Sequence, residues 1–371
     1  MKLMQKTSPD ILHDWMAIHL IPGLGNVLIK NLLDNFGSPD KIFKASISDL
    51  IEIDGISHKT ANKIKNREYT SDPIKEVKRV EKAGIRIITY SDPAYPKKLR
   101  DIYDPPMLLY LKGKDIPVNQ TFISVVGSRN PTQYGLRAAE KIGQGLARRG
   151  LGVASGMARG IDSAAHWGCL SGLGFTIAIL GTGIDVLYPK SNNKLFQQII
   201  RKGAVVSEFP VGTPPEPKNF PIRNRIIAGL SDGVAVVEAT KNSGSLITAS
   251  LALDQGREVF AVPGSINSFK STGCHFLIKQ GARLIENSDD IIEEIGLNHI
   301  YTPKTDTFKQ KPCPPMEESE KSLYDIIGDY PIHIDQVVRQ GNLKPEEASS
   351  ILMRMELKGI IKQLPGKMFV R

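Results

Sequence analysis

A chain of 371 residues is too long for one ordinary hydrophobic core, so we expect two or three domains. Its 41% hydrophobic content argues against a disordered chain. A membrane helix needs about 18 apolar residues in a row, and no apolar run in this sequence is that long. The formal net charge is +9, and residues 118–286 alone carry +8. Such a basic excess favours a polyanionic binding partner but is also a common route to solubility.

The cysteines and the N-terminus predict a cytoplasmic protein with no membrane contact. Cys169, Cys274 and Cys313 lie far apart and form no CxxC pair, which argues against a disulfide framework or a cysteine zinc site. The first ten residues lack the apolar segment of a signal peptide. The histidines show no metal-ligand spacing such as HExxH, so we expect neither a metal nor a cofactor.

Residues 1–70 predict a helical domain of the helix-hairpin-helix, or SAM-like, kind. Two glycine turns, Ile21–Gly25 and Ile53–Ser57, each precede a helical stretch. Hairpins of this kind offer backbone N–H groups to a DNA phosphate. The second hairpin has Ser57 where a glycine usually stands, so a purely structural role is an equal alternative. The helices after the turns are expected at Asn26–Leu33 and Lys59–Lys65.

Residues 71–300 predict a Rossmann-like α/β domain with its core at 118–296. Residues 68–117 read as a lead-in with one strand at Ile85–Tyr90. Short runs rich in Val, Ile and Ala then recur at β-α spacing and are continuous rather than alternating, which is typical of strands covered by helices on both faces. We therefore expect a doubly wound, mainly parallel sheet with its ligand site past the carboxyl ends of the strands. The strands are expected at Phe122–Val126, Leu151–Ala154, Thr176–Leu180, Ala204–Glu208, Val234–Glu238 and Glu258–Val262.

The first of these strands runs into Gly127-Ser128-Arg129 and then a helix. A glycine lets the backbone approach a ligand closely, and the free N–H groups at a helix start favour an anion. Arg129 adds a planar fork that can grip a phosphate with two hydrogen bonds. A glycine needed only for a tight turn is an equal alternative for this motif taken alone.

Similar groups follow other strands, and their repetition strengthens the signal. Small or hydroxylated residues recur at helix starts, with Ser155-Gly156 after the second strand and Ser243-Gly244-Ser245, followed by Thr248, after the fifth. The segment Arg223-Asn224-Arg225 opens a further helix, and Lys241 lies nearby. Several anion sites along one rim suit a dinucleotide or a polynucleotide. Neither a GxGxxG fingerprint nor a Walker A sequence is present, which favours a nucleic-acid backbone.

Few residues point to catalysis. Asp162 and His166 have i, i+4 spacing, which favours a structural pair over a catalytic dyad because no nucleophile is linked to them. Glu208 and Glu238 end strands at the rim and could serve as acids, although carboxylates that brace arginines are commoner. Phe220 and Phe269 are candidates for stacking on bases, but a core position is the favoured expectation for both.

Residues 301–316 contain several prolines and predict a linker, and residues 317–371 predict a winged helix. Three helices and a strand pair follow in the expected order. The recognition helix carries Glu346, Glu347 and Glu356, and the region from 287 onward has a net charge of −3. A protein-contact module is therefore at least as well supported as duplex binding. The elements are expected at Glu317–Ile327, Ile334–Gln340, Lys344–Lys358, Ile360–Leu364 and Lys367–Arg371.

Six motifs of the middle region occur in a fixed order, namely Val126–Arg129, Ser155–Asp162 with His166, Ser207–Pro210, Phe220–Asp232, Ser243–Ala249 and Gly256–Gly264. Together they resemble the DNA-processing protein DprA (Smf) family of bacteria. The resemblance rests on ordered motifs and is close over residues 85–290. It implies a non-enzymatic protein that binds single-stranded DNA without marked sequence preference, forms a homodimer through the Rossmann-like domain and loads RecA in natural transformation.

The resemblance also assigns the DNA-contacting residues. Gly127-Ser128-Arg129 matches the main phosphate-binding loop of the family, and the segment before Ser243 matches a second DNA contact. Asn242 stands where many relatives have a basic residue, and Lys241 can take that role with a shifted reach. The predicted contact set is Gly127, Ser128, Arg129, Ser155, Gly156, Arg223, Asn224, Arg225, Lys241, Asn242, Ser243, Gly244, Ser245 and Thr248.

Two alternatives remain open from the sequence. One is a nucleotide phosphoribohydrolase on a similar sheet, with Glu238 and Arg225 as reacting groups. The absence of the Pro-Gly-Gly-x-Gly-Thr signature of that class argues against it. The other is a pure adaptor, whose sheet only dimerises and presents a surface to RecA.

Overall fold

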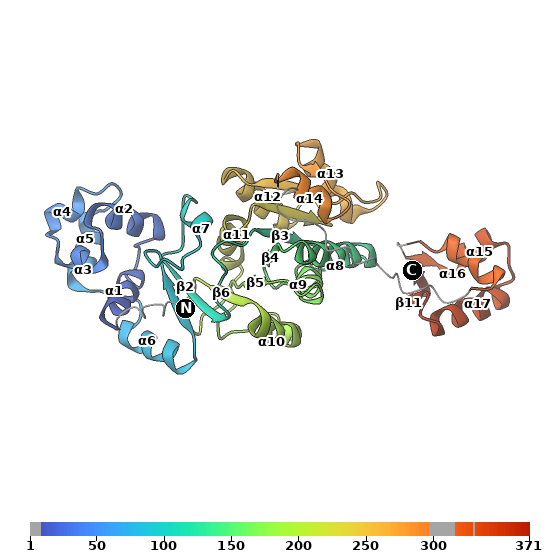
Figure 1. Cartoon of the computed structure of the whole chain (residues 1–371), viewed down its shortest axis with the longest axis horizontal. Coiled ribbons are helices and arrows are strands. Elements are labelled where there is room, and N and C mark those ends of the chain that lie inside the picture. The colour runs from blue at the N-terminus through green and yellow to red at the C-terminus, as the bar shows by residue number, and fades with distance from the viewer. Residues whose placement is uncertain (1–8, 297–315, 329–330) are drawn as a thin grey trace.

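The computed structural model describes residues 9–296, 316–328 and 331–371, and it begins with a helical unit (Figure 1). Two glycine turns lie inside this unit, and Gly23 and Gly55 have φ of 85° and 83°, a region that favours glycine. The helices predicted after both turns are confirmed. Trp15, Leu32 and Ile64 share one apolar cluster with Tyr110 of the sheet, so this unit packs against one end of the sheet. Its helices are α1 (Pro9–His19), α2 (Asn26–Phe36), α3 (Pro39–Lys44), α4 (Ile47–Ile51), α5 (His58–Asn66) and α6 (Pro73–Lys82).

The middle of the chain forms a nine-stranded, mainly parallel sheet, which confirms the predicted fold class. Its strand order is β1-β2-β6-β5-β4-β3-β7-β8-β9, and the strands from β6 to β9 in this order run parallel. The strands are β1 (Arg86–Thr89), β2 (Leu108–Gly113), β3 (Phe122–Gly127), β4 (Gly152–Ser155), β5 (Thr176–Ile179), β6 (Ala204–Ser207), β7 (Gly233–Val237), β8 (Glu258–Ala261) and β9 (Arg283–Leu284).

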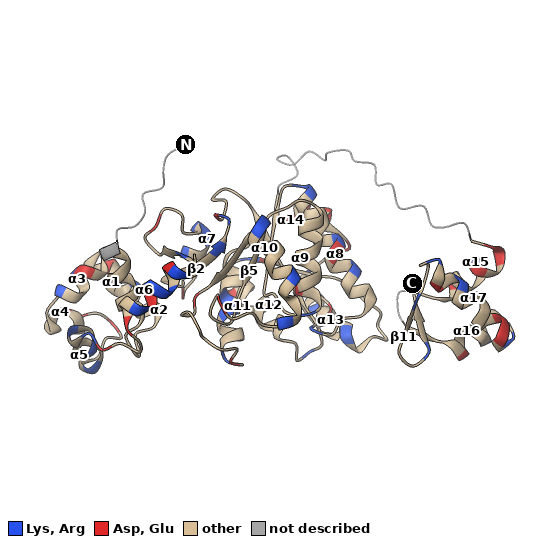
Figure 2. Ribbon diagram, turned by 90° about the horizontal axis from the view of Figure 1, so that it is seen from below, with Lys and Arg blue, Asp and Glu red and all other residues tan. Residues whose placement is uncertain are grey.

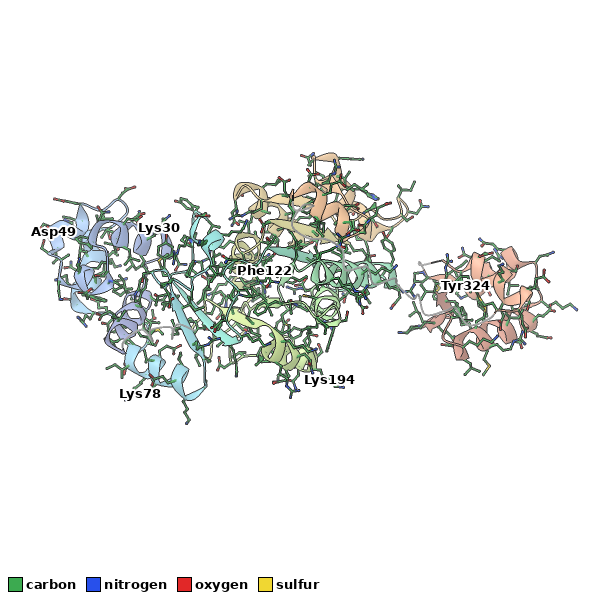
Figure 3. The ribbon with its side chains drawn as sticks, in the orientation of Figure 1. Lys30, Asp49, Lys78, Phe122, Lys194 and Tyr324 are labelled. Carbon is green, nitrogen blue, oxygen red and sulfur yellow. The ribbon has the colours of Figure 1, made fainter. Side chains whose placement is uncertain are left out.

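Helices cover both faces of this sheet (Figure 2). In β3, Ile123 and Val125 pack toward α8 and α9, whereas Phe122 and Val126 pack toward the opposite layer. Figure 3 shows Phe122 inside the domain and Lys194 at its surface. One layer contains α8 (Gln133–Arg148), α9 (Ile161–Ser171), α10 (Asn193–Lys202) and α14 (Ser288–Glu294), and the other contains α11 (Asn219–Gly229), α12 (Gly244–Asp254) and α13 (Thr272–Lys279). The remaining short helices are α7 (Lys97–Arg100), η1 (Lys190–Asn192) and η2 (Phe269–Ser271).

The six central strands were predicted, but two others were not. The lead-in contains β2 as well as β1, and β2 joins the sheet by antiparallel pairing with both β1 and β6. At the far edge β9 adds a two-residue strand next to β8. The sheet therefore contains more strands than the predicted six-strand core and its lead-in strand.

The C-terminal part has the predicted winged-helix arrangement. Its three helices surround an apolar cluster that includes Leu323, Leu352 and Phe369, and a small antiparallel sheet has the order β10-β12-β11. Residues 301–315 of the predicted linker lie outside the described residues, and the predicted domain boundaries stay a prediction. The elements are α15 (Glu318–Ile326), β10 (Ile332–His333), α16 (Ile334–Gly341), α17 (Pro345–Leu357), β11 (Lys362–Leu364) and β12 (Met368–Val370).

Candidate nucleic-acid interface

A pocket of about 440 Å³ opens at the carboxyl ends of β3 and β7. The chain leaves β3 to form β4 on one side, whereas β7 pairs with the other side, so the strand order reverses at this point. In open α/β sheets such a reversal is where ligands bind. Eight of the predicted contact residues line the pocket, namely Gly127, Arg129, Arg223, Asn224, Ser243, Gly244, Ser245 and Thr248.

The loop after β3 leaves no room for a side chain at its first residue. A Cβ at Gly127 would lie 1.9 Å from the Val237 carbonyl oxygen and 2.8 Å from Ile161 Cγ1. The amide of Ser128 donates to the Glu238 carbonyl at 2.8 Å, and the Ser128 hydroxyl accepts from the Asn130 amide at 3.2 Å. The backbone of this loop is therefore fixed close to β7, and Gly127 is needed for that approach.

The buried carboxylate of Glu238 holds the other end of the same loop. It accepts hydrogen bonds from the amide of Thr132, at 2.7 Å, and from the Thr132 hydroxyl. Thr132 in turn caps α8 by accepting from the Gly135 amide at 3.1 Å. Glu238 itself has φ of 53°, an uncommon conformation for a residue other than glycine. Such conformations persist where the surrounding contacts fix them, as they do here.

Arg129 is exposed at the pocket and lies beside an aromatic ring. Its guanidinium carbon is 5.4 Å from the centre of the Phe220 ring, and the Arg223 guanidinium carbon is 6.0 Å from the same ring. The Tyr188 ring lies 5.6 Å from Phe220. The prediction that Phe220 lies in the core is wrong, because Phe220 is partly exposed and lines the pocket. Phe269 is 75% exposed, so the same expectation is wrong there too.

A buried arginine and a buried aspartate lie beneath the pocket. Arg223 Nη1 donates to the carbonyls of Gly156, at 2.8 Å, and Ile179. Asp162 accepts from the amides of Gly156, at 3.1 Å, and Ala158, at 3.3 Å. Burial raises the pKa of Asp162 and lowers the pKa of Arg223 to about 10, so Arg223 remains charged at neutral pH. Arg223 thus places a fixed positive charge at the pocket while its hydrogen bonds hold the surrounding loops.

The N-terminus of α12 forms the opposite wall. Ser243 is its N-cap, and its hydroxyl accepts from the Ser245 amide at 3.4 Å and lies 2.8 Å from the Ser245 hydroxyl. Gly244 is exposed, and nothing lies within 4 Å of its Cβ position. The Gly244 amide and the helix dipole at this end attract an anion. Two walls that favour anions, at Arg129 and at α12, therefore face one pocket.

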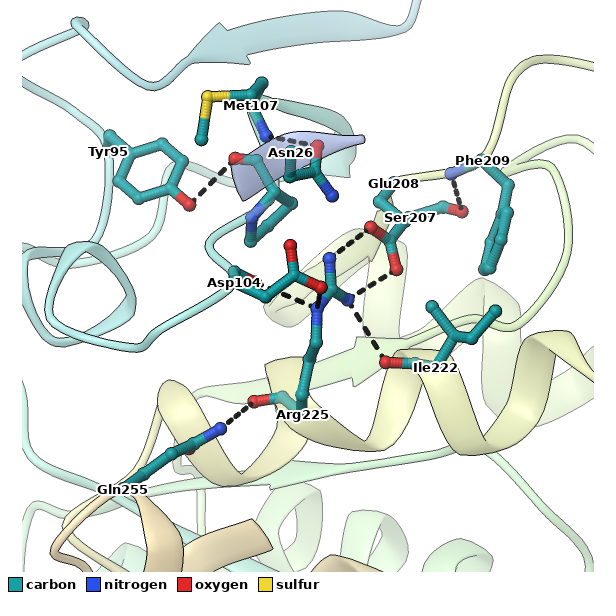
Figure 4. A network of polar contacts seen from close by, with 11 residues as sticks. Asn26, Tyr95, Asp104, Met107, Ser207, Glu208, Phe209, Ile222, Arg225 and Gln255 are labelled. Carbon is teal, nitrogen blue, oxygen red and sulfur yellow. Dashed lines mark hydrogen bonds and ion pairs between the residues drawn. The ribbon is translucent and has the colours of Figure 1, made fainter. Parts of the chain in front are cut away.

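Arg225 does not face this pocket. Figure 4 shows its guanidinium enclosed by carboxylates: Nη1 and Nη2 each lie 2.6 Å from a Glu208 oxygen, and Nε lies 2.8 Å from Asp104 Oδ2. Burial would lower the pKa of Arg225, but the charge and hydrogen bonds of Glu208 and Asp104 outweigh it and raise that pKa. Arg225 is therefore a structural ion-pair residue, and its guanidinium is not available to contact DNA in this pocket.

Five further predicted residues lie outside the pocket lining. Ser155 is buried and donates to the Val125 carbonyl at 2.6 Å. Gly156 fills the space between Arg223 and Asp162, where a Cβ would lie 2.6 Å and 2.8 Å from their nearest side-chain atoms. Ser128 supports the loop as described above. Lys241 and Asn242 are exposed just before α12, and their contact with DNA stays a prediction.

The groups considered for catalysis have structural partners. His166 Nδ1 lies 2.7 Å from the Thr176 hydroxyl, and Asp162 bonds to backbone amides, so the expected Asp162–His166 pair is replaced by two separate contacts. Burial lowers the pKa of His166 to about 3. Glu208 braces an arginine, as favoured, and Glu238 braces the β3 loop. Within the described residues no group of His, Cys, Asp and Glu could hold a metal ion.

Tyr188 lines the pocket, although no sequence motif pointed to it. It lies in the long connection after β5, beyond Gly181-Thr182-Gly183, and is 43% exposed. An aromatic residue in a loop that follows the carboxyl end of a parallel strand was the available signal.

None of the helices in the described ranges is long and apolar enough to span a bilayer.

Three family models match the chain. The model of DNA recombination-mediator protein A matches residues 86–296, the DprA winged helix domain matches residues 309–367, and a SAM-like helix-hairpin-helix tandem matches residues 20–67. Among curated proteins, Protein Smf of Synechocystis sp. is 36% identical over 389 aligned positions, which cover 96% of this chain and 98% of that protein.

Solved structures match as well. The X-ray structure of DprA from Streptococcus pneumoniae has a TM-score of 0.67 and 38% identity, and the match covers 76% of this chain and 95% of that one. A structure of DprA from Helicobacter pylori, described for its single-stranded DNA binding mode, has a TM-score of 0.52 and 29% identity. That match covers 59% of this chain and 97% of the H. pylori chain.

Proposed function

The chain belongs to the DprA (Smf) family of DNA-processing proteins, and we propose that it binds single-stranded DNA in the pocket between β3 and α12. The H. pylori relative is described as binding single-stranded DNA, and its match to this chain covers 97% of its length. A phosphate backbone offers a series of anions with bases between them. The pocket offers positive charge, a helix N-terminus and aromatic rings in the same place.

The observation that carries the proposal is the position of Arg129. Its guanidinium is exposed on a loop that Gly127 and Glu238 fix in place, so little ordering of the loop backbone remains to be done on binding. An arginine fork binds a phosphate through charge-assisted hydrogen bonds. Phe220 lies next to it and offers a ring face on which a base can stack.

The opposite wall supplies the second contact in this proposal. The Gly244 amide and the helix dipole at the start of α12 receive a neighbouring phosphate, and Lys241 adds charge from outside the pocket. Asn224, whose amide nitrogen lies 3.5 Å from the Gly244 carbonyl, lines the same wall. Backbone amides and arginines read phosphates rather than base edges, so we expect little sequence preference.

The proposed biological role is that of a recombination mediator that loads RecA onto single-stranded DNA, without a catalytic step of its own. It rests on family membership, as does the proposed homodimer through the Rossmann-like domain. The cytoplasmic location stays a prediction. A pull-down with RecA, made with and without oligonucleotide, separates a mediator that binds both from a pure adaptor that binds RecA alone.

A salt series with Arg129→Ala tests the DNA-binding site. We expect the affinity for fluorescent oligo-dT, measured by anisotropy, to fall roughly 10- to 100-fold because charge-assisted hydrogen bonds are lost. The slope of log affinity against log salt should become smaller by about 0.7, the value for one phosphate on a single strand.

The matched control is Arg201→Ala. Arg201 is exposed at the end of α10 and precedes the amino end of β6, so it lies at the other edge of the sheet. This variant should keep both the affinity and the salt slope. Unchanged binding by Arg129→Ala, with Arg201→Ala equally unchanged, would remove Arg129 from the site.

A further inference from the structure

A second pocket, of about 640 Å³, lies along the same rim of the sheet. It is formed by the first turns of α8 and α9 together with η1. Its lining includes Arg137, Arg159, Ser163, Trp167 and Asn192. Neither the matched family descriptions nor the DNA-binding site proposed above accounts for this pocket.

The two pockets are neighbours because one loop borders both. Ala158 and Asp162 line the first pocket, whereas Arg159, Gly160 and Ser163 line the second. The loop is also tied to the Arg129 loop, since a Cβ at Gly160 would lie 2.3 Å from the Ser128 carbonyl oxygen. A ligand that leaves the first pocket on this side therefore meets Arg159 and then the second pocket.

Trp167 is an exposed aromatic residue in a position where packing does not need it. It is 41% exposed, although the residues on either side of it, His166 and Gly168, are buried. The α8–α9 contact is made by glycines: a Cβ at Gly168 would lie 2.1 Å from the Glu140 carbonyl, and one at Gly143 would lie 2.4 Å from the Ala165 carbonyl. The indole therefore lies outside this close helix contact and offers its ring to a ligand.

The floor beside Trp167 is held in place by hydrogen bonds. The Asn192 side-chain amide donates to the Met157 carbonyl at 2.8 Å and to the Ser163 hydroxyl at 2.9 Å. Ser163 in turn donates to the Ala158 carbonyl at 2.5 Å. The loop that carries Arg159 is thus ordered before any ligand arrives. Ordering in advance lowers the entropic cost of binding.

The chemistry of this pocket suits a nucleotide. An aromatic face stacks on any base, and an arginine pairs with the phosphate that links it to the next nucleotide. Glu140 is an acidic residue of the lining and disfavours a phosphate deep in the pocket. The base is therefore expected at Trp167 and the phosphate at Arg159, on the side nearer the first pocket.

We propose that single-stranded DNA held at Arg129 continues over Arg159 and stacks a base on Trp167, which makes the second pocket an additional nucleotide subsite. This inference rests on the proposed DNA binding at the first pocket. It also predicts a dependence on strand length. A strand of about 16 nucleotides should reach Trp167, whereas one of about 4 nucleotides should fill the first pocket alone.

Tryptophan fluorescence tests the subsite directly, because the chain has only two tryptophans and Trp15 is 2% exposed. The longer oligo-dT should quench the fluorescence of the wild-type protein, and Trp167→Phe should lose that quench. By anisotropy, Trp167→Ala should bind the longer strand about 5- to 150-fold more weakly, the range for loss of one base–aromatic stack. Trp167→Phe keeps a ring and should bind nearly as well as wild type.

The controls separate the possible failures. Leu173→Ala removes another exposed apolar side chain, 86% exposed and just after α9, and should leave DNA binding unchanged. If the wild type binds the longer strand but shows no quench, and Trp167→Ala keeps full affinity, the subsite is refuted while the first pocket stands. The subsite is also refuted if Trp167→Ala keeps DNA binding and loses only the RecA pull-down. If the wild type binds no strand at all, the proposed function itself fails.

Discussion

Removing the carboxylate of Glu208 tests whether Arg225 stabilises the fold rather than contacting DNA. The two side chains are 7% and 8% exposed and form two parallel 2.6 Å contacts. In Glu208→Ala the buried guanidinium would keep one carboxylate partner, Asp104, whose side chain is 38% exposed, together with the backbone carbonyls of Asp104 and Ile222. A buried charge left without its main partner is strongly unfavourable.

The expected loss of unfolding free energy in Glu208→Ala is about 3–5 kcal/mol, the range for breaking a buried ion pair. Asp104→Ala should lose about 1 kcal/mol or less, because its carboxylate is partly solvated and Glu208 remains. The double variant Glu208→Ala/Arg225→Met removes the charge as well as its partner. It should recover much of the loss, which a double-mutant cycle would show as a large coupling energy.

Urea unfolding followed by circular dichroism measures these differences in unfolding free energy. They are read from the urea concentration at the midpoint, provided that the dependence of the free energy on urea concentration is the same in all variants. Oligo-dT anisotropy, recorded well below the unfolding transition, should show unchanged affinity for Arg225→Met. The assignment of Arg225 would be refuted if Glu208→Ala lost less than about 1 kcal/mol. It would be refuted equally if Arg225→Met weakened DNA binding as much as Arg129→Ala does.

Three further substitutions test stability in and around the site. Gly156→Ala should lower the free energy of unfolding by about 1–3 kcal/mol, because its Cβ would meet Arg223 and Asp162. Gly244→Ala has open space at its Cβ and should change the free energy of unfolding by less than about 1 kcal/mol in the same denaturation assay. Burial lowers the pKa of His166 from 6.5 to about 3. At pH values between these two, the unfolded chain binds a proton at His166 that the folded chain does not. His166 should therefore contribute a fall in the free energy of unfolding of about 1.4 kcal/mol per pH unit as the pH drops through this window. In His166→Asn the dependence of that free energy on pH should be smaller by this amount.

The parallel core was predictable because each buried strand is a short apolar run with a helix after it. β2 was missed because it follows Pro105-Pro106 and pairs antiparallel with both neighbours, so no β-α spacing marks it. β9 has only two residues, too few for any hydrophobic pattern. Strand periodicity therefore identifies apolar runs that a helix follows, and it misses a strand that is very short, such as β9, or one that leads to the next strand without a helix, such as β2.

The arginines of α11 show why the site was predictable only in part. Arg223 and Arg225 are two residues apart, so a helix points them in nearly opposite directions. One reaches the pocket and the other reaches Glu208 and Asp104. The sequence shows that two arginines are present near the rim. Which of them meets a carboxylate depends on Glu208 and Asp104, which are 17 and 121 residues away along the chain, and no local pattern contains that information.

A crystal structure with a bound oligo-dT tests the central claim most directly. The account predicts phosphate oxygens against the Arg129 guanidinium and against the amides at the start of α12, with a base near Phe220. An oligonucleotide bound elsewhere on the chain, with the pocket between β3 and α12 free of it, would contradict the account.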